Sequence, residues 1–461
     1  MNAPVHPDRD KRSGGRWSTP GLVVELLQLA AIERATAHVQ AGWLAKISGL
    51  DQKLHFATAV ESNMSRAAAL RQHASRLLER DGTALRAQRG WIAPLRDLDA
   101  SSDHAEVCAA LAGVTGFLLT RYDDLVSRLD PLCDSRLIAT LRGARDVLSA
   151  QRDAVASRSG AASFAEALRA AAAADDDTVA LDEMLWRPVD RVAVPVRPAG
   201  RPRPEAGARA HLRSVSRLEP EDIAAELNDN VMAELAAMEL LARCSYEHPD
   251  LSWSFHASLA AHVSDEARHA AIFRRLMVSR GIDECDLPQH AANYEFAYEF
   301  PECAPGSKHE LIWRILILCT VLEALAVDKL PVEIATRDWL GQSDIARALD
   351  YIAADELFHT ENGLRLTREL CKAEHLDPML ERELVHGRFF GRQRNVRARY
   401  LQADPERAAR EIEIVDSPDP DGIAFVSRTE VELRRRASFT EEECEQVDRW
   451  GYNPRSALPR N

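Results

Sequence analysis

The stretch Asp265-Glu266-Ala267-Arg268-His269 decides the fold of this chain, together with Asp355-Glu356-Leu357-Phe358-His359, which lies further along the sequence. Each stretch holds the pattern Glu-x-x-His with an aspartate directly before the glutamate. Each also lies in a segment whose apolar residues recur at helical spacing. Because residues three apart on a helix share a face, each motif can point a carboxylate and an imidazole at one place.

Two further glutamates lie at matching distances before these motifs. The interval from Glu234 to Glu266 is nearly the same as the interval from Glu323 to Glu356. A turn at Asp250 would be equally far along the chain from Glu234 and from Glu266. Residues equally far from the turn of an antiparallel hairpin face each other, so the spacing places the members of each glutamate pair at one level. The sequence therefore predicts four helices that direct four carboxylates and two imidazoles to one site.

This ordered set resembles the ferritin-like di-iron carboxylate superfamily over about residues 215–375, because that superfamily draws a Glu-x-x-His pair from two helices and a lone glutamate from the other two. The resemblance implies a ferritin-like four-helix bundle. It also implies that Glu266 and Glu356 bridge two metal ions, that Asp265 orients His359 and that Asp355 orients His269. The implied metal ligands are Glu234, Glu266, His269, Glu323, Glu356 and His359.

Charge balance independently favours two metal ions. A buried unpaired carboxylate costs several kcal/mol, and two divalent cations would balance four such groups. Mixed carboxylate and imidazole donors suit Fe(II) or Mn(II), so we expect two iron ions or a Mn/Fe pair. Glu239 is a reserve ligand or a supporting residue. His262, one turn before Glu266, either lines the site or is an ordinary core or surface histidine.

The resemblance implies an O₂-activating oxygenase or oxidase with O₂ as co-substrate, a small organic substrate and an external electron donor. One alternative is iron or peroxide handling, as in ferritin and rubrerythrin; the length of 461 residues and the absence of a Cys-x-x-Cys pair disfavour it. Another is a hydroxylase of modified tRNA, although a net charge of −14 argues against a nucleic-acid partner. The last is a structural helical protein in which the motifs are accidental.

We predict an all-α chain in which a ferritin-like bundle follows a second, degenerate helical bundle. Residues 1–18 are expected to be disordered, and residues 19–185 to form the first bundle. Residues 186–210 hold five prolines and are predicted to be a linker. The di-metal bundle is assigned to residues 211–385, and a C-terminal extension to residues 386–461.

The first bundle has the pattern of a metal-free copy of the second. Ala30-Ala31-Ile32-Glu33 parallels Ala236-Ala237-Met238-Glu239. In the same register Gln28, Asn63 and Arg66 stand where the second bundle has Glu234, Glu266 and His269. The alternative is that the two regions are unrelated helices that share alanine and arginine usage.

Local signals set further expectations. Pro220 is expected to begin a helix, Gly281 to follow the end of one, and Ser307 to cap a helix that ends before Pro331. Arg434 to Arg436 are read as a solvated, salt-bridged surface helix, with an anion-binding or subunit-docking helix as the alternative. The final twenty residues are read as an irregular extension. With neither an export signal nor an apolar stretch of membrane length, we expect a cytoplasmic protein without membrane contact. The sequence leaves a homodimer open.

Overall fold

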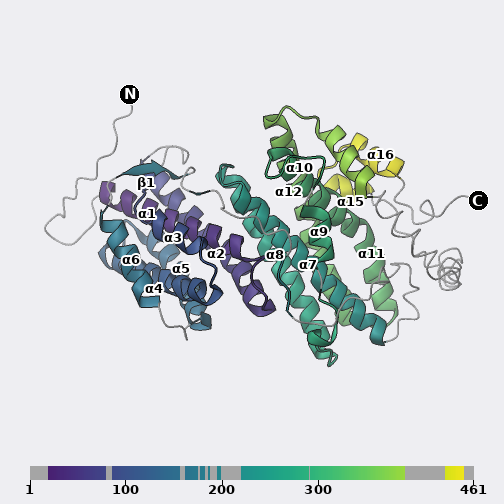
Figure 1. Cartoon of the computed structure of the whole chain (residues 1–461), viewed down its shortest axis with the longest axis horizontal. Helices are drawn as coiled ribbons and strands as arrows, with labels where there is room; N and C mark the ends of the chain where they lie inside the picture. Colours follow the sequence, from purple (N-terminus) through teal and green to yellow (C-terminus); the bar gives the residue numbers. More distant parts are fainter. Residues whose placement is uncertain are drawn as a thin grey trace, which may run out of the picture. The chain divides into compact units, whose positions relative to one another are not determined.

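The computed structural model describes residues 19–78, 86–155, 161–174, 177–181, 185–186, 195–198, 220–289, 291–298, 300–389 and 431–450. This part of the chain is predominantly helical (Figure 1), which confirms the all-α prediction. Its strands β1 (Arg86–Gln88) and β2 (Thr178–Ala180) form one short antiparallel ladder, with Ala87 opposite Val179. The predicted disordered segment 1–18 and most of the predicted linker lie outside the described residues.

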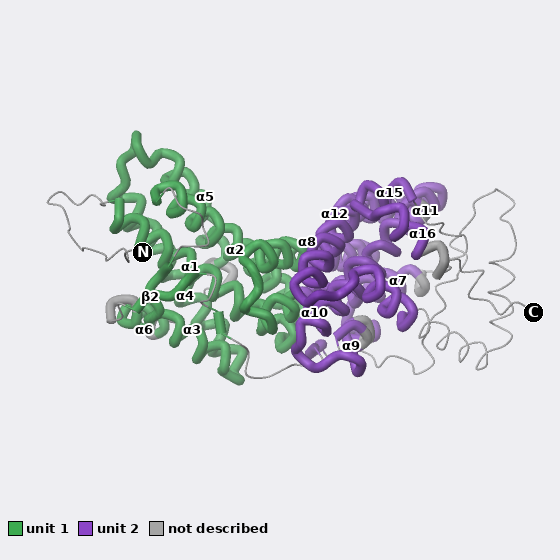
Figure 2. Tube along the Cα trace, turned by 90° about the horizontal axis from the view of Figure 1, so that it is seen from above, with its two compact units in different colours: residues 1–192, 242–264 green, residues 193–241, 265–461 purple. Residues whose placement is uncertain are grey.

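The chain divides into two compact units (Figure 2). Unit 1 comprises residues 1–192 and 242–264, and unit 2 comprises residues 193–241 and 265–461. One division between the units, at residue 192, lies inside the predicted linker. The others pass through two long helices of the predicted di-metal bundle, so the units do not coincide with the predicted domain bounds.

Unit 1 begins with a helical hairpin of α1 (Thr19–Trp43) and α2 (Leu50–Leu78), followed by α3 (Ile92–Asp99), α4 (His104–Arg128), α5 (Ser135–Val155) and α6 (Ala161–Ala174). Alanine and leucine dominate α1, which is buried almost all round. The sequence signals did not predict α3 or the two strands. The end of α7 (Pro220–Glu247), from residue 242 on, also belongs here: the Tyr246 hydroxyl donates to Asp99 at 2.6 Å.

Unit 2 contains most of α7 and the second half of α8 (Trp253–Ser279), then η4 (Glu284–Asp286), α9 (Ala292–Tyr298), α10 (Lys308–Ile315), η5 (Leu316–Leu322), α11 (Glu323–Trp339) and α12 (Ser343–Ala373). The signals at Gly281 and Ser307 act as predicted. Gly281 has φ of 70° directly after α8, and the Ser307 side chain accepts from the Glu310 backbone N–H at 3.1 Å.

The helix that begins after Ser307 differs from its prediction in two ways. Pro331 does not end it, because α11 continues to Trp339 with the proline inside. The segment η5 is a π-helix, with hydrogen bonds from i to i+5, and it ends directly before Glu323. Such π-segments in α-helices often mark functional sites. Because a π-turn contains more residues than an α-turn, the π-segment changes which face the following side chains occupy.

The C-terminal region corrects two predictions. Residues 378–389 are helical, and α15 (Val431–Arg436) and α16 (Glu441–Trp450) follow the undescribed residues 390–430. Arg434 is 1% exposed, so the reading of residues 434–436 as a solvated surface helix is wrong at this position. The expectation of an irregular final segment is wrong for residues 442–450, which lie in α16. Among the described residues, no helix is long and apolar enough to cross a membrane.

Candidate metal centre

Four helices supply the carboxylates and imidazoles of the candidate centre. Glu234 lies on α7, Glu266 and His269 on α8, Glu323 at the start of α11, and Glu356 and His359 on α12. Their donor atoms form two groups, each with all of its atoms within 4.8 Å of one another. The two groups are Glu234, His269, Glu356 and His262, Glu266, Glu323, His359. The six predicted ligands are therefore brought together, and these buried clusters could hold a metal ion.

Both motif histidines present the same ring nitrogen to the carboxylates. Nδ1 of His269 lies 3.8 Å from Glu234, 3.7 Å from Glu266 and 3.7 Å from Glu356. Nδ1 of His359 lies 3.1 Å from Glu266 and 3.7 Å from Glu356. A neutral imidazole that keeps its proton on Nε2 would thus offer the Nδ1 lone pair to a cation.

The two motif aspartates bind the opposite ring nitrogens. Nε2 of His269 lies 3.0 Å from Asp355, and Nε2 of His359 lies 3.2 Å from Asp265. These are the crossed pairs that the family resemblance implies. A carboxylate that accepts the other N–H of a metal-bound histidine fixes its tautomer and ring orientation. The contacts therefore suit histidines that bind a metal through Nδ1.

Arg268 joins the two aspartates and was not singled out from the sequence. Its Nη2 lies 2.8 Å from Asp265 and 2.6 Å from Asp355. One guanidinium thus holds both carboxylates that orient the histidines. Its place in the first motif could have indicated this contact, because Arg268 lies three residues after Asp265 and therefore on the same face of the helix.

The electrostatics show how poorly the carboxylates tolerate one another without a cation. Burial, followed by the charge of Glu266, raises the pKa of Glu234 to about 8. Burial, followed by the charge of Glu323, raises the pKa of Glu356 well above its usual value. Burial lowers the pKa of His359, but hydrogen bonds to Asp265 and Glu266 outweigh it and raise that pKa to about 9. Protons would balance the charge here unless metal ions replace them.

The donor atoms themselves fit a metal ion. Nδ1 of His269 and Oε2 of Glu356 are buried, and neither has a hydrogen-bond partner among the described residues. Buried polar atoms without partners cost free energy, and a cation between them would remove that cost. Carboxylate oxygen and imidazole nitrogen together are the donors that Fe(II) and Mn(II) accept.

The two reserve residues have different positions. His262 joins the group that contains Glu266, one turn before it on α8. Glu239 belongs to neither group: both of its carboxylate oxygens accept from Arg197, at 2.5 and 2.7 Å. The structure therefore gives Glu239 a charge partner of its own and places it outside the cluster.

A close contact between α12 and the π-segment lies beside the site. A Cβ added to Gly363 would lie 2.1 Å from Cβ of Cys319. Gly363 follows His359 by one turn of α12, and Cys319 precedes Glu323 by four residues in the π-segment. The glycine therefore lets α12 approach the π-segment closely beside two of the predicted ligands.

The corresponding positions in unit 1 contain an arginine. Glu33 accepts from Arg66 at 2.8 and 3.0 Å and from the Tyr122 hydroxyl at 2.6 Å. Arg66 also donates to Asn63, the predicted counterpart of Glu266. A guanidinium thus supplies the positive charge at the place that parallels His269. Glu33 and its predicted counterpart Glu239 are both buried, and each binds an arginine.

Comparison with known protein families identifies a family for this chain. The model of a family described as "Protein of unknown function (DUF455)" matches residues 158–410, and the chain belongs to this family. The match includes all six predicted ligands. No curated protein and no solved structure matches the chain.

Proposed function

We propose that this member of the DUF455 family is a di-iron oxidoreductase, an oxygenase or oxidase that uses O₂ on a small organic substrate. In this proposal unit 2 supplies a ferritin-like bundle, and Glu234, Glu266, His269, Glu323, Glu356 and His359 hold two iron ions or a Mn/Fe pair. The observation that carries the proposal is the convergence of these donors with both imidazoles held by aspartates. The choice of O₂ and of a small substrate rests on the family resemblance.

Bound ferrous ions would supply the electrons that reduce O₂. The chain's own residues prepare the site for this. Asp355 and Asp265 accept hydrogen bonds from Nε2 of His269 and His359, so the neutral imidazoles would turn their Nδ1 lone pairs toward the carboxylates. Arg268 neutralises both aspartates from the half-exposed side of the site. Burial of Glu266 and Glu356 excludes water from the middle of the cluster.

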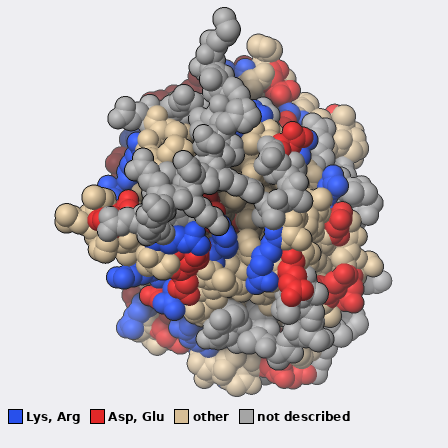
Figure 3. All heavy atoms as spheres, turned by 90° about the vertical axis from the view of Figure 1, so that its left-hand side faces the viewer, with Lys and Arg blue, Asp and Glu red and all other residues tan. Residues whose placement is uncertain are grey.

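The charge distribution supports a small substrate over a nucleic acid. The chain has a net charge of −14. On the face drawn in Figure 3, Lys and Arg side chains lie next to Asp and Glu side chains. A mixture of this kind does not favour binding to a phosphate backbone, whose affinity comes from clustered basic groups. An external electron donor is part of the proposal, because a catalytic cycle that uses O₂ needs the iron to be reduced again.

The test is anaerobic loading of the full chain with Fe(II), with iron counted per chain, followed by rapid mixing with O₂ while absorbance is recorded. We expect about two irons per chain, as the donor count of a dinuclear site requires, and a transient visible band. Glu266→Ala and His359→Ala should abolish iron binding. Gln28→Ala is the matched control, because Gln28 is the predicted unit 1 counterpart of Glu234, and it should bind as much iron as the unaltered chain.

Three outcomes contradict parts of the proposal. Full iron content in both ligand variants would show that the ligands are assigned wrongly. Two irons with slow, featureless oxidation and continuing uptake would instead indicate iron storage or detoxification. A chain that binds no iron or manganese would show that the cluster is not a metal centre.

A further inference from the structure

The C-terminal segment 431–446, here called the C-terminal strap, packs against two of the helices that carry predicted ligands. Its Ala437, Phe439 and Cys444 form one buried apolar cluster with Ala324 of α11 and Leu364 of α12. Ala324 directly follows Glu323, and Leu364 lies five residues after His359. The strap therefore contacts both helices beside the candidate centre, although it comes after the undescribed residues 390–430.

Arg434 is the strongest polar contact of the strap. Its Nε lies 3.0 Å from one oxygen of Asp328, and its Nη2 lies 2.5 Å from the other. The same Nη2 donates to the backbone carbonyl of Ala324 at 3.3 Å. Arg434 and Asp328 are 1% and 0% exposed, so the pair is screened from water. The guanidinium thus spans one turn of α11, beginning at the residue next to Glu323.

An aromatic ring and a second arginine complete the contact. Two guanidinium groups lie over the ring of Phe439. The guanidinium carbon of Arg382 is 4.6 Å from the ring centroid, and that of Arg434 is 5.1 Å from it. Arg382 is 1% exposed, and its Nη2 donates to the Glu443 carbonyl at 3.4 Å. These interactions tie the strap to residues 378–389 as well as to α11.

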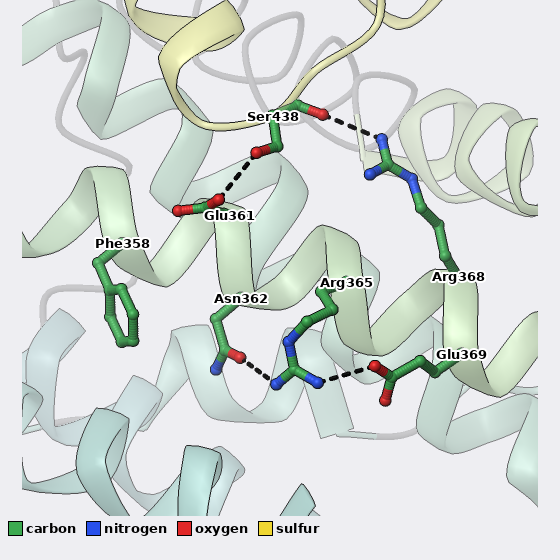
Figure 4. A pocket seen from close by; sticks show the side chains of 7 residues that line it. All are labelled: Phe358, Glu361, Asn362, Arg365, Arg368, Glu369 and Ser438. Atoms are coloured by element: carbon green, nitrogen blue, oxygen red, sulfur yellow. Dashed lines mark hydrogen bonds and ion pairs between the residues drawn. The ribbon is translucent and has the colours of Figure 1, made fainter. Parts of the chain in front are cut away.

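At its outer edge the strap is hydrogen-bonded to α12 (Figure 4). The Ser438 hydroxyl donates to Glu361 at 2.8 Å, and its carbonyl accepts from Arg368 at 3.1 Å. Ser438 has φ of 67°, a left-handed conformation that costs free energy in any residue with a side chain. Beside it lies a groove of about 510 Å³ whose lining includes Phe358 and Asn362. The turn is thus held in a strained conformation where it meets α12.

We infer that Arg434 is a positioning residue for the candidate centre: by holding Ala324 and Asp328, it fixes the turn of α11 that directs Glu323 toward Glu356. This inference rests on the proposed function. It predicts that the strap contributes to metal affinity and does more than stabilise the fold. Replacing residues that support metal ligands from outside costs about 10- to 100-fold in metal affinity.

The test compares Arg434→Lys with Arg435→Lys in the full chain. Lysine keeps the charge near Asp328 but cannot make the two-pronged contact that also reaches the Ala324 carbonyl. Arg435 is the matched control, because it is exposed and its partners Glu432 and Glu441 lie in the strap itself. Mn(II) affinity is measured by electron paramagnetic resonance of the free ion, and the melting temperature is measured on metal-free protein.

We expect Arg434→Lys to weaken Mn(II) binding about tenfold or more and Arg435→Lys to leave it unchanged. Should Arg434→Lys fail to fold, Phe439→Leu loosens the strap more gently and should still weaken binding measurably. Unchanged affinity in the folded variant, with or without a lower melting temperature, overturns the inference alone. Absence of Mn(II) and Fe(II) binding in the unaltered chain overturns the proposed function and this inference together.

Discussion

Gly363→Ala tests whether the close approach of α12 to the π-segment maintains the candidate centre. The added methyl group would lie 2.1 Å from Cβ of Cys319, 3.1 Å from its sulfur and 3.4 Å from its Cα. Because the nearest atom is Cβ, rotation of the cysteine side chain cannot relieve the clash. One of the two backbones must move.

The required displacement follows from these distances. Ordinary contacts of a Cβ begin at 3.4 Å, whereas the added Cβ would have a neighbour at 2.1 Å. The two helices must therefore separate by roughly 1 Å, and overpacking of this kind costs about 1–3 kcal/mol in free energy of unfolding. The displacement falls within one turn of His359 and of Glu323. Since a supporting shell that is about 1 Å too loose impairs a site, we expect metal affinity to fall together with stability.

The measurements are the unfolding midpoint of metal-free protein and Mn(II) affinity. Gly143→Ala is the control, because Gly143 lies inside α5 and an added Cβ there meets no atom within 4 Å. Alanine in a helix is favoured over glycine, so this control should be stabilised by about 0.5–1 kcal/mol. A Gly363→Ala protein that matches the control in stability and the unaltered chain in affinity would refute the reasoning.

Three further changes probe other charged or titratable side chains. Arg66→Met leaves Glu33 without its cation and should cost unit 1 about 3–5 kcal/mol by chemical denaturation; a loss below about 1 kcal/mol would contradict the buried pair. Burial lowers the pKa of His38 to about 3, so protons bind the unfolded chain preferentially below about pH 6.5. As the pH is lowered from about 6.5 to about 3, the free energy of unfolding should therefore decrease by up to about 1.4 kcal/mol per pH unit. His38→Gln should make this pH dependence weaker. Arg268→Met should weaken Mn(II) binding, because Arg268 holds both aspartates that orient the histidines. If the variant and the unaltered chain give the same Mn(II) titration curve, Arg268 does not support the site.

Spacing alone predicted much of the candidate site. The nearly equal intervals between the lone glutamates and the motif glutamates anticipated that Glu234 would lie near Glu266 and Glu323 near Glu356. These arguments hold because helix geometry is regular and because turn signals such as Gly281 act locally. Metal binding by these donors stays a prediction.

Other features could not be read from local patterns. The π-segment changes hydrogen bonding over Leu316–Leu322, an apolar run that also suits an ordinary helix. The burial of Arg434 depends on Asp328, which lies far earlier in the chain. Pro331 marks the end of a helix by a local rule that tertiary packing overrides here. Each case turns on a partner far away in the sequence or on a bond pattern that side-chain periodicity does not encode.

The two units show contrasting ways to bury a carboxylate. In unit 1, Glu33 has Arg66 and the Tyr122 hydroxyl, so one negative charge meets one positive charge within the protein. In unit 2, Glu234, Glu266 and Glu356 lie 3.1 to 3.8 Å from the Nδ1 atoms of two imidazoles, and those imidazoles are also bound to aspartates. Arg268 neutralises the aspartates rather than the cluster. Protein groups therefore complete the charge balance in unit 1, whereas the cluster in unit 2 must either take up protons or bind cations.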